Sequence, residues 1–133
     1  MTQTLKFSAP ASQAQDPDES RPDFSIIILN WNTRDLLVDC LNTIFQHAAD
    51  LSLEVIVVDN ASTDGSQAML REHFPQVRLI ANHDNVGFAK GNNQGMAVSQ
   101  GRYWLLLNSD AFITPGSLTA LLQLLRLSLR QEL

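Results

Sequence analysis

Four short apolar runs along the chain alternate with four stretches in which apolar residues recur at helical spacing. The apolar runs cover Phe24–Leu29, Glu54–Val58, Val77–Ala81 and Tyr103–Leu107. Nearly continuous apolar runs of this length are typical of strands that are covered on both faces. They predict the strands of a mostly parallel sheet.

A helical pattern follows each predicted strand. The four patterns cover residues 34–48, 66–73 and 88–100 and the segment from Thr114 onward. Thr33 is of a residue type that caps helix N-termini, and Pro115 suits the first position of the last helix. Strict alternation of strands and helices predicts an α/β fold, a mostly parallel open sheet with helices on both faces.

The two ends of the chain depart from this pattern. Residues 1–23 are polar, acidic and rich in proline, so we expect a disordered tail ahead of one domain at 24–133. In the last helix Leu124 and Leu127 lie off the main apolar face, which is formed by Leu118, Leu121, Leu122, Leu125 and Leu129. A helix that is apolar over so much of its circumference is normally covered by other elements on more than one side. Either a partner supplies that cover, or the domain is truncated at its C-terminus.

Composition narrows the class of protein. The chain has 133 residues, 44% of them hydrophobic and 17% charged, which suits one domain with a real core. A net charge of −5 without any Lys/Arg cluster disfavours nucleic acid as a partner. The single cysteine, Cys40, excludes an internal disulfide and a multi-cysteine zinc site, and we expect it in the core. No signal peptide or transmembrane segment is recognisable, so the expected location is cytoplasmic.

Polar side chains follow every predicted strand at its carboxyl end. They are Asn30 to Asn32 after the first strand, Asp59 and Asn60 after the second, residues 82–85 after the third and Asn108 to Asp110 after the fourth. Ligands of open parallel sheets bind beyond the carboxyl ends of the strands. The four ends together therefore predict a hydrogen-bonding crevice for nucleobase and sugar edges and for a divalent cation.

Several other nucleotide and hydrolase motifs are absent. Gly87, Gly91 and Gly95 are spaced by four residues and do not follow the first strand, so a dinucleotide-binding fingerprint is disfavoured. The chain has no P-loop sequence and no nucleophile with a histidine partner at a strand-to-helix elbow.

Four linked segments resemble a known family. They are residues 25–32 (SIIILNWN), 57–66 (VVDNASTDGS), 85–95 (NVGFAKGNNQG) and 105–110 (LLLNSD). In order and spacing they resemble the nucleotide-binding half of family 2 glycosyltransferases, which have the Rossmann-like GT-A fold, and most of all the rhamnosyltransferase-like branch. The resemblance implies transfer of a sugar, with inversion, from a nucleoside-diphosphate sugar to an acceptor hydroxyl, in cell-wall or polysaccharide biosynthesis.

The resemblance also implies roles for residues around the nucleotide. Asp59 would accept a hydrogen bond from the imino N–H of a pyrimidine base, in a UDP- or dTDP-linked donor alike. Asn30 and Asn32 would line the nucleoside pocket, with Trp31 either beneath the base or in the core. Asn85, Gly87 and Asn93 belong to the motif that borders the ribose and the diphosphate, where a glycine lets the backbone approach closely.

The fourth segment implies the metal site. Asp110 corresponds to the carboxylate that holds Mg²⁺ or Mn²⁺ against the diphosphate, and Asn108 stands where many relatives carry a second aspartate. Asn92 stands where many relatives carry arginine, so one phosphate-facing cation is missing. Lys90 is a possible replacement, although a solvated lysine is the favoured interpretation.

The same resemblance leaves the catalytic base unassigned. In the family that base lies beyond the metal motif, with the acceptor site, and the only acidic residue after Asp110 is Glu132. We therefore assign no catalytic residue and expect no efficient turnover by this chain alone. A saccharide or lipid-linked acceptor would bind the missing half, and peripheral membrane association stays open. The alternatives are a non-catalytic nucleotide-binding module or inactive fragment and, less favoured, a sugar-nucleotidyltransferase, which would need a glycine-rich basic loop after the first strand.

Overall fold

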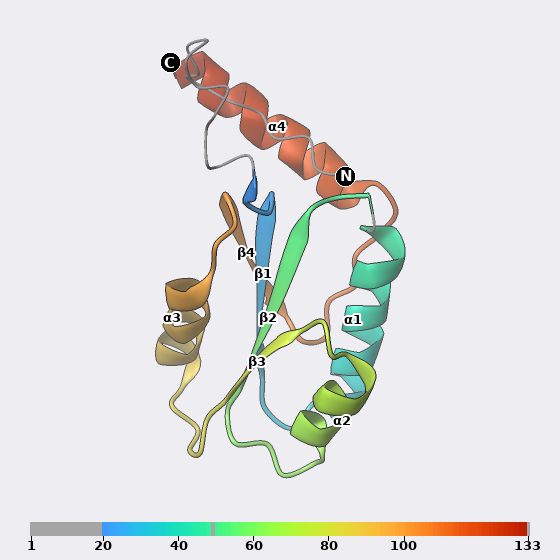
Figure 1. The fold of residues 1–133 in the computed structure, drawn as a ribbon, viewed down its shortest axis with the longest axis vertical. Helices are drawn as coiled ribbons and strands as arrows, with labels where there is room; N and C mark the ends of the chain where they lie inside the picture. The colour runs from blue at the N-terminus through green and yellow to red at the C-terminus, as the bar shows by residue number, and fades with distance from the viewer. Residues whose placement is uncertain (1–19, 49, 133) are drawn as a thin grey trace.

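The computed structural model describes residues 20–48 and 50–132 (Figure 1). In chain order the elements are β1 (Phe24–Asn30), α1 (Arg34–His47), β2 (Leu53–Asp59), α2 (Ser66–His73), β3 (Arg78–Ala81), α3 (Phe88–Val98), β4 (Tyr103–Asn108) and α4 (Ser117–Glu132). The predicted alternation of strands and helices is confirmed.

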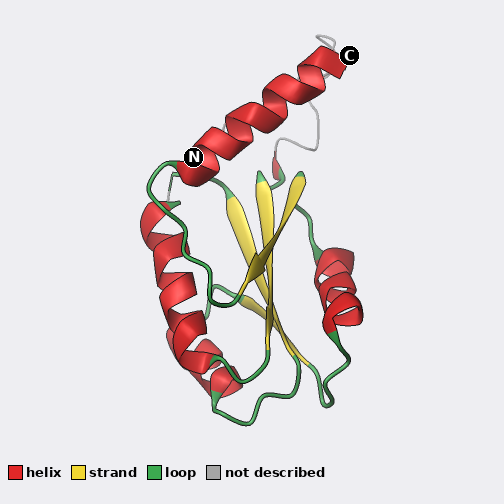
Figure 2. Cartoon of the chain, turned by 180° about the vertical axis from the view of Figure 1, so that it is seen from behind, coloured by secondary structure: helices red, strands yellow, loops and turns green. Residues whose placement is uncertain are grey.

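The four strands form one parallel sheet in the order β3-β2-β1-β4. Helices α1 and α2 cover one face of the sheet and α3 covers the other, while α4 crosses near the amino ends of the strands (Figures 1 and 2). The register pairs Asn30 with Asp59 and Leu29 with Asn108. The carboxyl ends of β1, β2 and β4 are thus level, as the fold class predicted.

Burial on both faces explains the apolar runs. In β1 the side chains of Ile26 and Ile28 enter the core beneath α1 and α2, whereas Ile27 packs on the α3 side. All three are fully buried. Because a strand alternates its side chains between the two faces, a strand covered on both must be apolar at every position. Cys40 lies in the first of these cores, as predicted, and burial raises the pKa of its thiol to about 11.

On the α3 side the cover is incomplete. Helix α3 contacts β1 and β2, while β4 is one of the two edge strands of the sheet. The register places Trp104 and Leu106 on the same face as Ile27, and their exposed fractions are 59% and 47%. The sheet therefore presents apolar side chains at its β4 edge.

Residues at the amino ends of the strands correct the predicted tail boundary. Arg21 donates hydrogen bonds to the carbonyls of Gln100 and Gly101, and Asp23 is buried. The tail was predicted to run through Asp23, but the domain already includes these residues because they close the loop before β4. The rest of the predicted tail, residues 1–19, lies outside the described residues.

Helix α4 begins later than predicted. Gly116 has a φ of 77° and Ser117 donates to the carbonyl of Thr114, so Pro115 lies in a turn and not in the first helical turn. Leu118 and Leu122 are buried, whereas Leu124 and Leu127 are exposed, as the sequence pattern predicted. Among the described residues, no helix is long and apolar enough to cross a bilayer.

Helix α3 approaches the sheet closely because it carries glycines on its inner face. A Cβ at Gly91 would lie 2.5 Å from Leu29 Cδ1, and one at Gly95 would lie 2.6 Å from Ile27 Cγ2. Such contacts are closer than carbon atoms tolerate. The two glycines therefore set the distance between α3 and the sheet.

We predict that Gly95→Ala destabilises the fold by about 1–3 kcal/mol through overpacking, although alanine favours a helix interior by about 1 kcal/mol over glycine. Ile27 cannot yield easily because it is fully buried. Urea unfolding measures the difference, with Ala97→Gly at an exposed position of α3 as control. An unchanged or stabilised Gly95→Ala would show that α3 can move away from the sheet at no cost.

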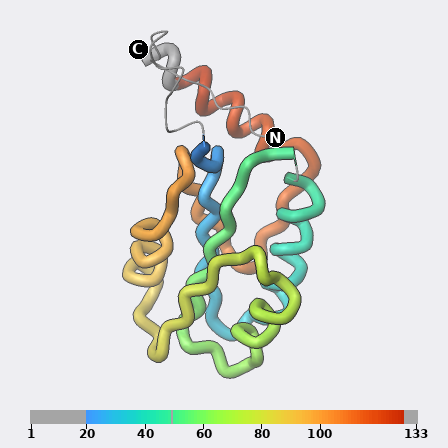
Figure 3. The backbone as a smooth tube through the Cα atoms, in the orientation of Figure 1, coloured from blue at the N-terminus to red at the C-terminus, as the bar shows by residue number. Residues whose placement is uncertain are grey.

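An ion pair at the amino end of the sheet links α4 to the residue just before β1. The tube in Figure 3 shows α4 crossing this end of the molecule. Arg126 Nη2 lies 3.4 Å from Asp23 Oδ1, and the Asp23 side chain is 2% exposed. Burial raises the pKa of the Asp23 carboxyl above its ordinary 3.8, and the positive charge of Arg126 offsets this only in part.

This shift predicts a pH dependence of stability. Since the folded state binds the Asp23 proton more tightly, the contribution is fully present below pH 3.8 and is lost as the pH rises through the folded-state pKa. The free energy of unfolding of Asp23→Asn minus that of the wild type should therefore increase as the pH rises from about 4 to about 7. Urea titrations across that range measure it, and a pH-independent difference would contradict the prediction.

Candidate functional site

A hollow of about 380 Å³ opens at the carboxyl ends of β1 and β4. Its wall consists of Leu29, Thr33, Leu36, Phe88, Asn92, Leu106, Leu107, Asn108, Ser109 and Asp110. The apolar side chains come from β1, α1, α3 and β4, and most of the polar ones come from the end of β4 and the loop after it. Hollows of this size with a few convergent polar groups are typical of small-molecule sites.

Next to the hollow, Asp59 is fully buried and its carboxylate accepts four hydrogen bonds. Oδ1 accepts from Asn30 Nδ2 at 2.8 Å and from Ser62 Oγ at 2.6 Å. Oδ2 accepts from the Ser62 N–H at 2.9 Å and from Gln67 Nε2 at 2.8 Å. A carboxylate has about four acceptor positions, so those of Asp59 are filled from within the protein. Its predicted contact with a base stays a prediction, and in this structure the carboxylate organises the loops around it.

A chain of hydrogen bonds runs from Asp59 to the end of β4. Asn30, which is also fully buried, accepts at Oδ1 from Thr33 Oγ1 at 2.6 Å. Thr33 Oγ1 lies 2.9 Å from Ser109 Oγ. Because the Thr33 hydroxyl has one proton and gives it to Asn30, Ser109 must be the donor in the second contact. The end of β4, where Asp110 follows Ser109, is thereby linked to the end of β2.

The β1–α1 loop is held by a second set of bonds. Asn32 has a φ of 54°, and its Oδ1 accepts from the Thr63 N–H at 2.7 Å. Its own N–H donates to Ser62 Oγ at 2.9 Å. Trp31, between these fixed residues, is 55% exposed. Of the two positions considered for Trp31, the structure excludes the core.

The predicted ribose and diphosphate motif surrounds the start of α3. Asn85 Oδ1 accepts from the Gly87 N–H, and Gly87 has a φ of 91°, a conformation that glycine adopts without strain. Asn60 Nδ2 donates to the Gly87 carbonyl, which ties this turn to the end of β2. Asn93 and Lys90 are exposed on α3.

Asp110 and Asn108 are exposed and line the hollow. Within residues 20–48 and 50–132 no three His, Cys, Asp or Glu side chains gather closely enough to hold a metal ion. One carboxylate and one amide oxygen fit Mg²⁺ or Mn²⁺ only when phosphate oxygens complete the coordination, a common arrangement for these cations. The residues present therefore fit a metal that arrives with a diphosphate.

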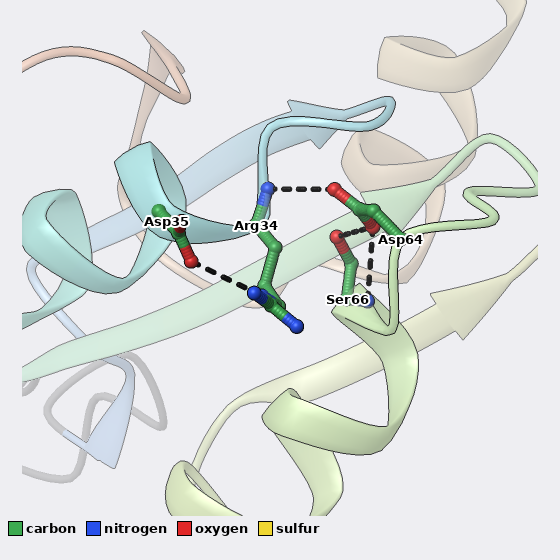
Figure 4. A network of polar contacts seen from close by, with 4 residues as sticks. All are labelled: Arg34, Asp35, Asp64 and Ser66. Carbon is green, nitrogen blue, oxygen red and sulfur yellow. Dashed lines mark hydrogen bonds and ion pairs between the residues drawn. The ribbon is translucent and has the colours of Figure 1, made fainter.

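Asp64 caps two helices at once (Figure 4). Its Oδ2 accepts from the Arg34 N–H at 2.9 Å, and its Oδ1 accepts from the N–H and hydroxyl of Ser66. Burial alone would raise the pKa of Asp64, but the bonds from Ser66 and Arg34 hold it below the ordinary 3.8. Thr33 occupies the N-cap position of α1, as predicted, but its hydroxyl makes no capping bond and donates to Asn30 Oδ1 instead.

Sequence patterns missed several residues that build the site. Ser62 and Gln67 hold Asp59, and Asp64 holds two helix starts. Asp64 stands two residues before α2, a position from which an N-terminal cap could have been recognised. Its bond to Arg34 spans 30 residues, and no local pattern predicts that.

Comparison with known proteins identifies the family. The family described as "Glycosyl transferase family 2" matches residues 25–127, which include all the polar strand ends described above. The chain belongs to glycosyltransferase family 2. The strands that carry these ends form the half-domain expected of the GT-A fold.

Two curated relatives illustrate the sequence similarity. The succinoglycan biosynthesis protein ExoO of Rhizobium meliloti is 29% identical over 77% of this chain and 29% of its own length. The putative teichuronic acid biosynthesis glycosyltransferase TuaG of Bacillus subtilis is 29% identical over 68% of this chain and 36% of its own length. The chain thus spans about a third of the length of these relatives.

Solved structures agree on the fold. The mannosyltransferase PcManGT of Pyrobaculum calidifontis, in complex with GDP-Man and Mn²⁺, is 26% identical with a TM-score of 0.66, over 80% of this chain and 32% of that one. S. aureus TarS in complex with UDP-GlcNAc is 25% identical with a TM-score of 0.65, over 74% of this chain and 30% of that one.

We predict that Asp64→Ala destabilises the protein by about 2 kcal/mol, since it removes two helix caps worth about 1 kcal/mol each. Because the bonds lower the pKa of Asp64, this contribution is present at neutral pH and is lost only as the pH falls below 3.8. Chemical denaturation at pH 7 measures the loss. The control is Asp35→Ala, which removes an exposed ion pair with Arg34 and should cost about 0.5 kcal/mol. Equal costs for the two variants would show that the double cap contributes nothing special.

Proposed function

We propose that this chain supplies the donor- and metal-binding half of an inverting glycosyltransferase that moves a sugar from a nucleoside-diphosphate sugar to an acceptor hydroxyl. The observation that carries the proposal is the hollow at the level ends of β1 and β4. Asp110 and Asn108 line it, and the hydrogen-bond chain joins it to Asp59. Membership of glycosyltransferase family 2 supports it.

The nucleoside would lie over the loops that Asp59 and Asp64 hold in place. Trp31 offers an exposed aromatic face on a fixed loop, and aromatic rings stack on bases whatever the base. Asn30, Asn32 and Asp59 shape this part of the site. A UDP- or dTDP-linked donor is proposed, supported by TarS, whose structures hold UDP-GlcNAc and UDP.

The diphosphate would lie between the α3 start and the end of β4. Gly87 allows close approach of the backbone, and Asn85 and Asn93 flank the same turn and helix. Asp110 and Asn108 would hold Mg²⁺ or Mn²⁺ together with the phosphate oxygens, and the PcManGT structure contains Mn²⁺. When bound, such a cation offsets the charge that develops on the diphosphate leaving group.

The general base and the acceptor site are proposed to lie in a part of the enzyme that this chain does not contain. The relatives are about three times as long as the matched segment. The relatives named for succinoglycan and teichuronic acid support a saccharide or lipid-linked acceptor in cell-wall or polysaccharide biosynthesis. By itself the chain is expected to bind a donor without efficient turnover.

The test is calorimetric titration of the chain with UDP and dTDP, each with and without Mn²⁺. We expect saturable binding that Mn²⁺ strengthens about tenfold or more, and we expect Asp110→Asn to abolish the strengthening. The matched control is Asp50→Asn, which removes an exposed carboxylate just before β2, at the opposite end of the sheet.

Two outcomes would contradict the proposal. One is the absence of binding by a chain that circular dichroism shows to be folded. The other is an Mn²⁺ effect that persists in Asp110→Asn and disappears in Asp50→Asn, since the cation would then bind elsewhere.

A further inference from the structure

Asn92 differs from the other buried polar residues of the described chain. It is 5% exposed and lies on α3, where it lines the hollow. The other buried polar residues, Asp23, Ser25, Asn30, Asp59, Asn60 and Ser66, all have side-chain hydrogen bonds or ion pairs. Within the described residues the Asn92 amide has no hydrogen-bond partner.

The Asn92 amide has no partner within the described residues, so its donor and acceptor groups are left to solvent or to a ligand. Nothing in the local packing requires a polar side chain here. Leu29, Phe88 and Leu106 line the same hollow, so an apolar residue would find apolar neighbours. A small part of the amide is accessible to solvent, and this part faces the hollow. It is therefore placed to bond whatever enters.

The chemistry of the hollow narrows the choice of ligand group. Asn92 enters the wall from α3, whereas Asn108 and Asp110 come from the end of β4 and the loop after it. A carboxamide both donates and accepts hydrogen bonds, whereas ionised phosphate oxygens only accept. A group that matches both capacities is a hydroxyl. In a nucleoside-diphosphate sugar, hydroxyls stand on the ribose and on the transferred sugar.

We propose that Asn92 is a specificity-determining residue that hydrogen-bonds a hydroxyl of the sugar nucleotide. This inference rests on the proposed function, because it needs a donor whose diphosphate reaches Asp110. The proposal gives Asn92 a direct contact with the ligand through its neutral carboxamide. The residues that line the hollow include no basic side chain.

The experiment compares Asn92→Leu with the wild type in calorimetric titrations with UDP, 2′-deoxy-UDP and UDP-GlcNAc, all with Mn²⁺. Leucine is close to asparagine in size, cannot form hydrogen bonds and suits the apolar wall. We expect affinity for UDP-GlcNAc to fall about tenfold, while the melting temperature stays at or above that of the wild type. The control is Asn42→Leu on the exposed side of α1, outside the hollow, which should leave affinity unchanged.

The probes separate the two sources of the hydroxyl. If the 2′-hydroxyl of the ribose is contacted, Asn92→Leu weakens UDP but not 2′-deoxy-UDP, and if the 3′-hydroxyl is contacted, it weakens both. If the transferred sugar is contacted, UDP and 2′-deoxy-UDP are bound as by the wild type and only UDP-GlcNAc is weakened. Asn92→Ala, which removes the amide without adding charge or bulk, provides a second variant should Asn92→Leu fail to fold, and it should weaken the same probe.

Other results would overturn the inference. A wild type that binds UDP with Mn²⁺ and an Asn92→Leu variant with unchanged affinity for all three probes would show that Asn92 is not a contact. Loss of stability with unchanged affinity in the folded fraction would show a purely structural role. Failure of the wild type to bind UDP at all would count against the proposed function, and the inference would fall with it.

Discussion

The buried carboxylate of Asp59 is the constraint from which the rest of the site follows. A charge without exposure to water must be stabilised by hydrogen bonds, and no Lys or Arg is among the groups that bond to it. Its donors are Asn30, Ser62 and Gln67, which belong to β1, the β2–α2 loop and α2. Satisfying one carboxylate thus fixes the positions of three segments. Asn30 also accepts a hydrogen bond from Thr33, and Thr33 bonds Ser109 at the end of β4, so the same network positions this end of the strand.

Close packing of α3 supplies the second half of the arrangement. Gly91 and Gly95 let α3 lie close against β1 and β2. This places Asn92, the residue after Gly91, in the wall of the hollow. A helix held further away by ordinary side chains would leave Asn92 short of the sheet. The same placement leaves β4 uncovered on the α3 side, so Trp104 and Leu106 are exposed. The position of α3 over β1 and β2 therefore determines both where Asn92 lies and which part of the sheet is left uncovered.

How far the sequence predicts this structure depends on the range of the interactions. Strands and helices follow from local apolar patterns, and their alternation predicts a parallel sheet whose polar ends converge. Thr33 holds the N-cap position of α1 but makes no capping bond with its side chain, because its hydroxyl bonds Asn30 and Ser109 across elements. The Arg34 N–H is instead satisfied by Asp64, 30 residues away. Pro115 failed as a helix start because the left-handed Gly116 follows it. Both residues are of types that suit a helix start. Tertiary hydrogen bonds engage the Thr33 hydroxyl, and a turn at Gly116 keeps Pro115 out of the helix.

The site residues show the same division. The positions of Asn108 and Asp110 at a strand end were predictable, because the pattern that defines β4 also defines where it stops. The saturation of Asp59 and the isolation of Asn92 were not, since each depends on which side chains meet across elements. From the sequence, Asn92 is only a neutral residue at a position where the family resemblance implies an arginine. Its burial without a partner is seen only in the structure.

Charge explains why a donor would need a cation here. The residues that line the hollow include one carboxylate, Asp110, and no Lys, Arg or His. A diphosphate brought close to that carboxylate meets repulsion that a partly enclosed site screens poorly. Lys90 is exposed on α3 and does not line the hollow, and Arg34 bonds to Asp35. Asn92 is neutral, so the residues that line the hollow supply no positive charge at this point. Under the proposed function, Asp110 would hold a divalent cation whose charge would offset this repulsion, so metal and nucleotide would be expected to bind together.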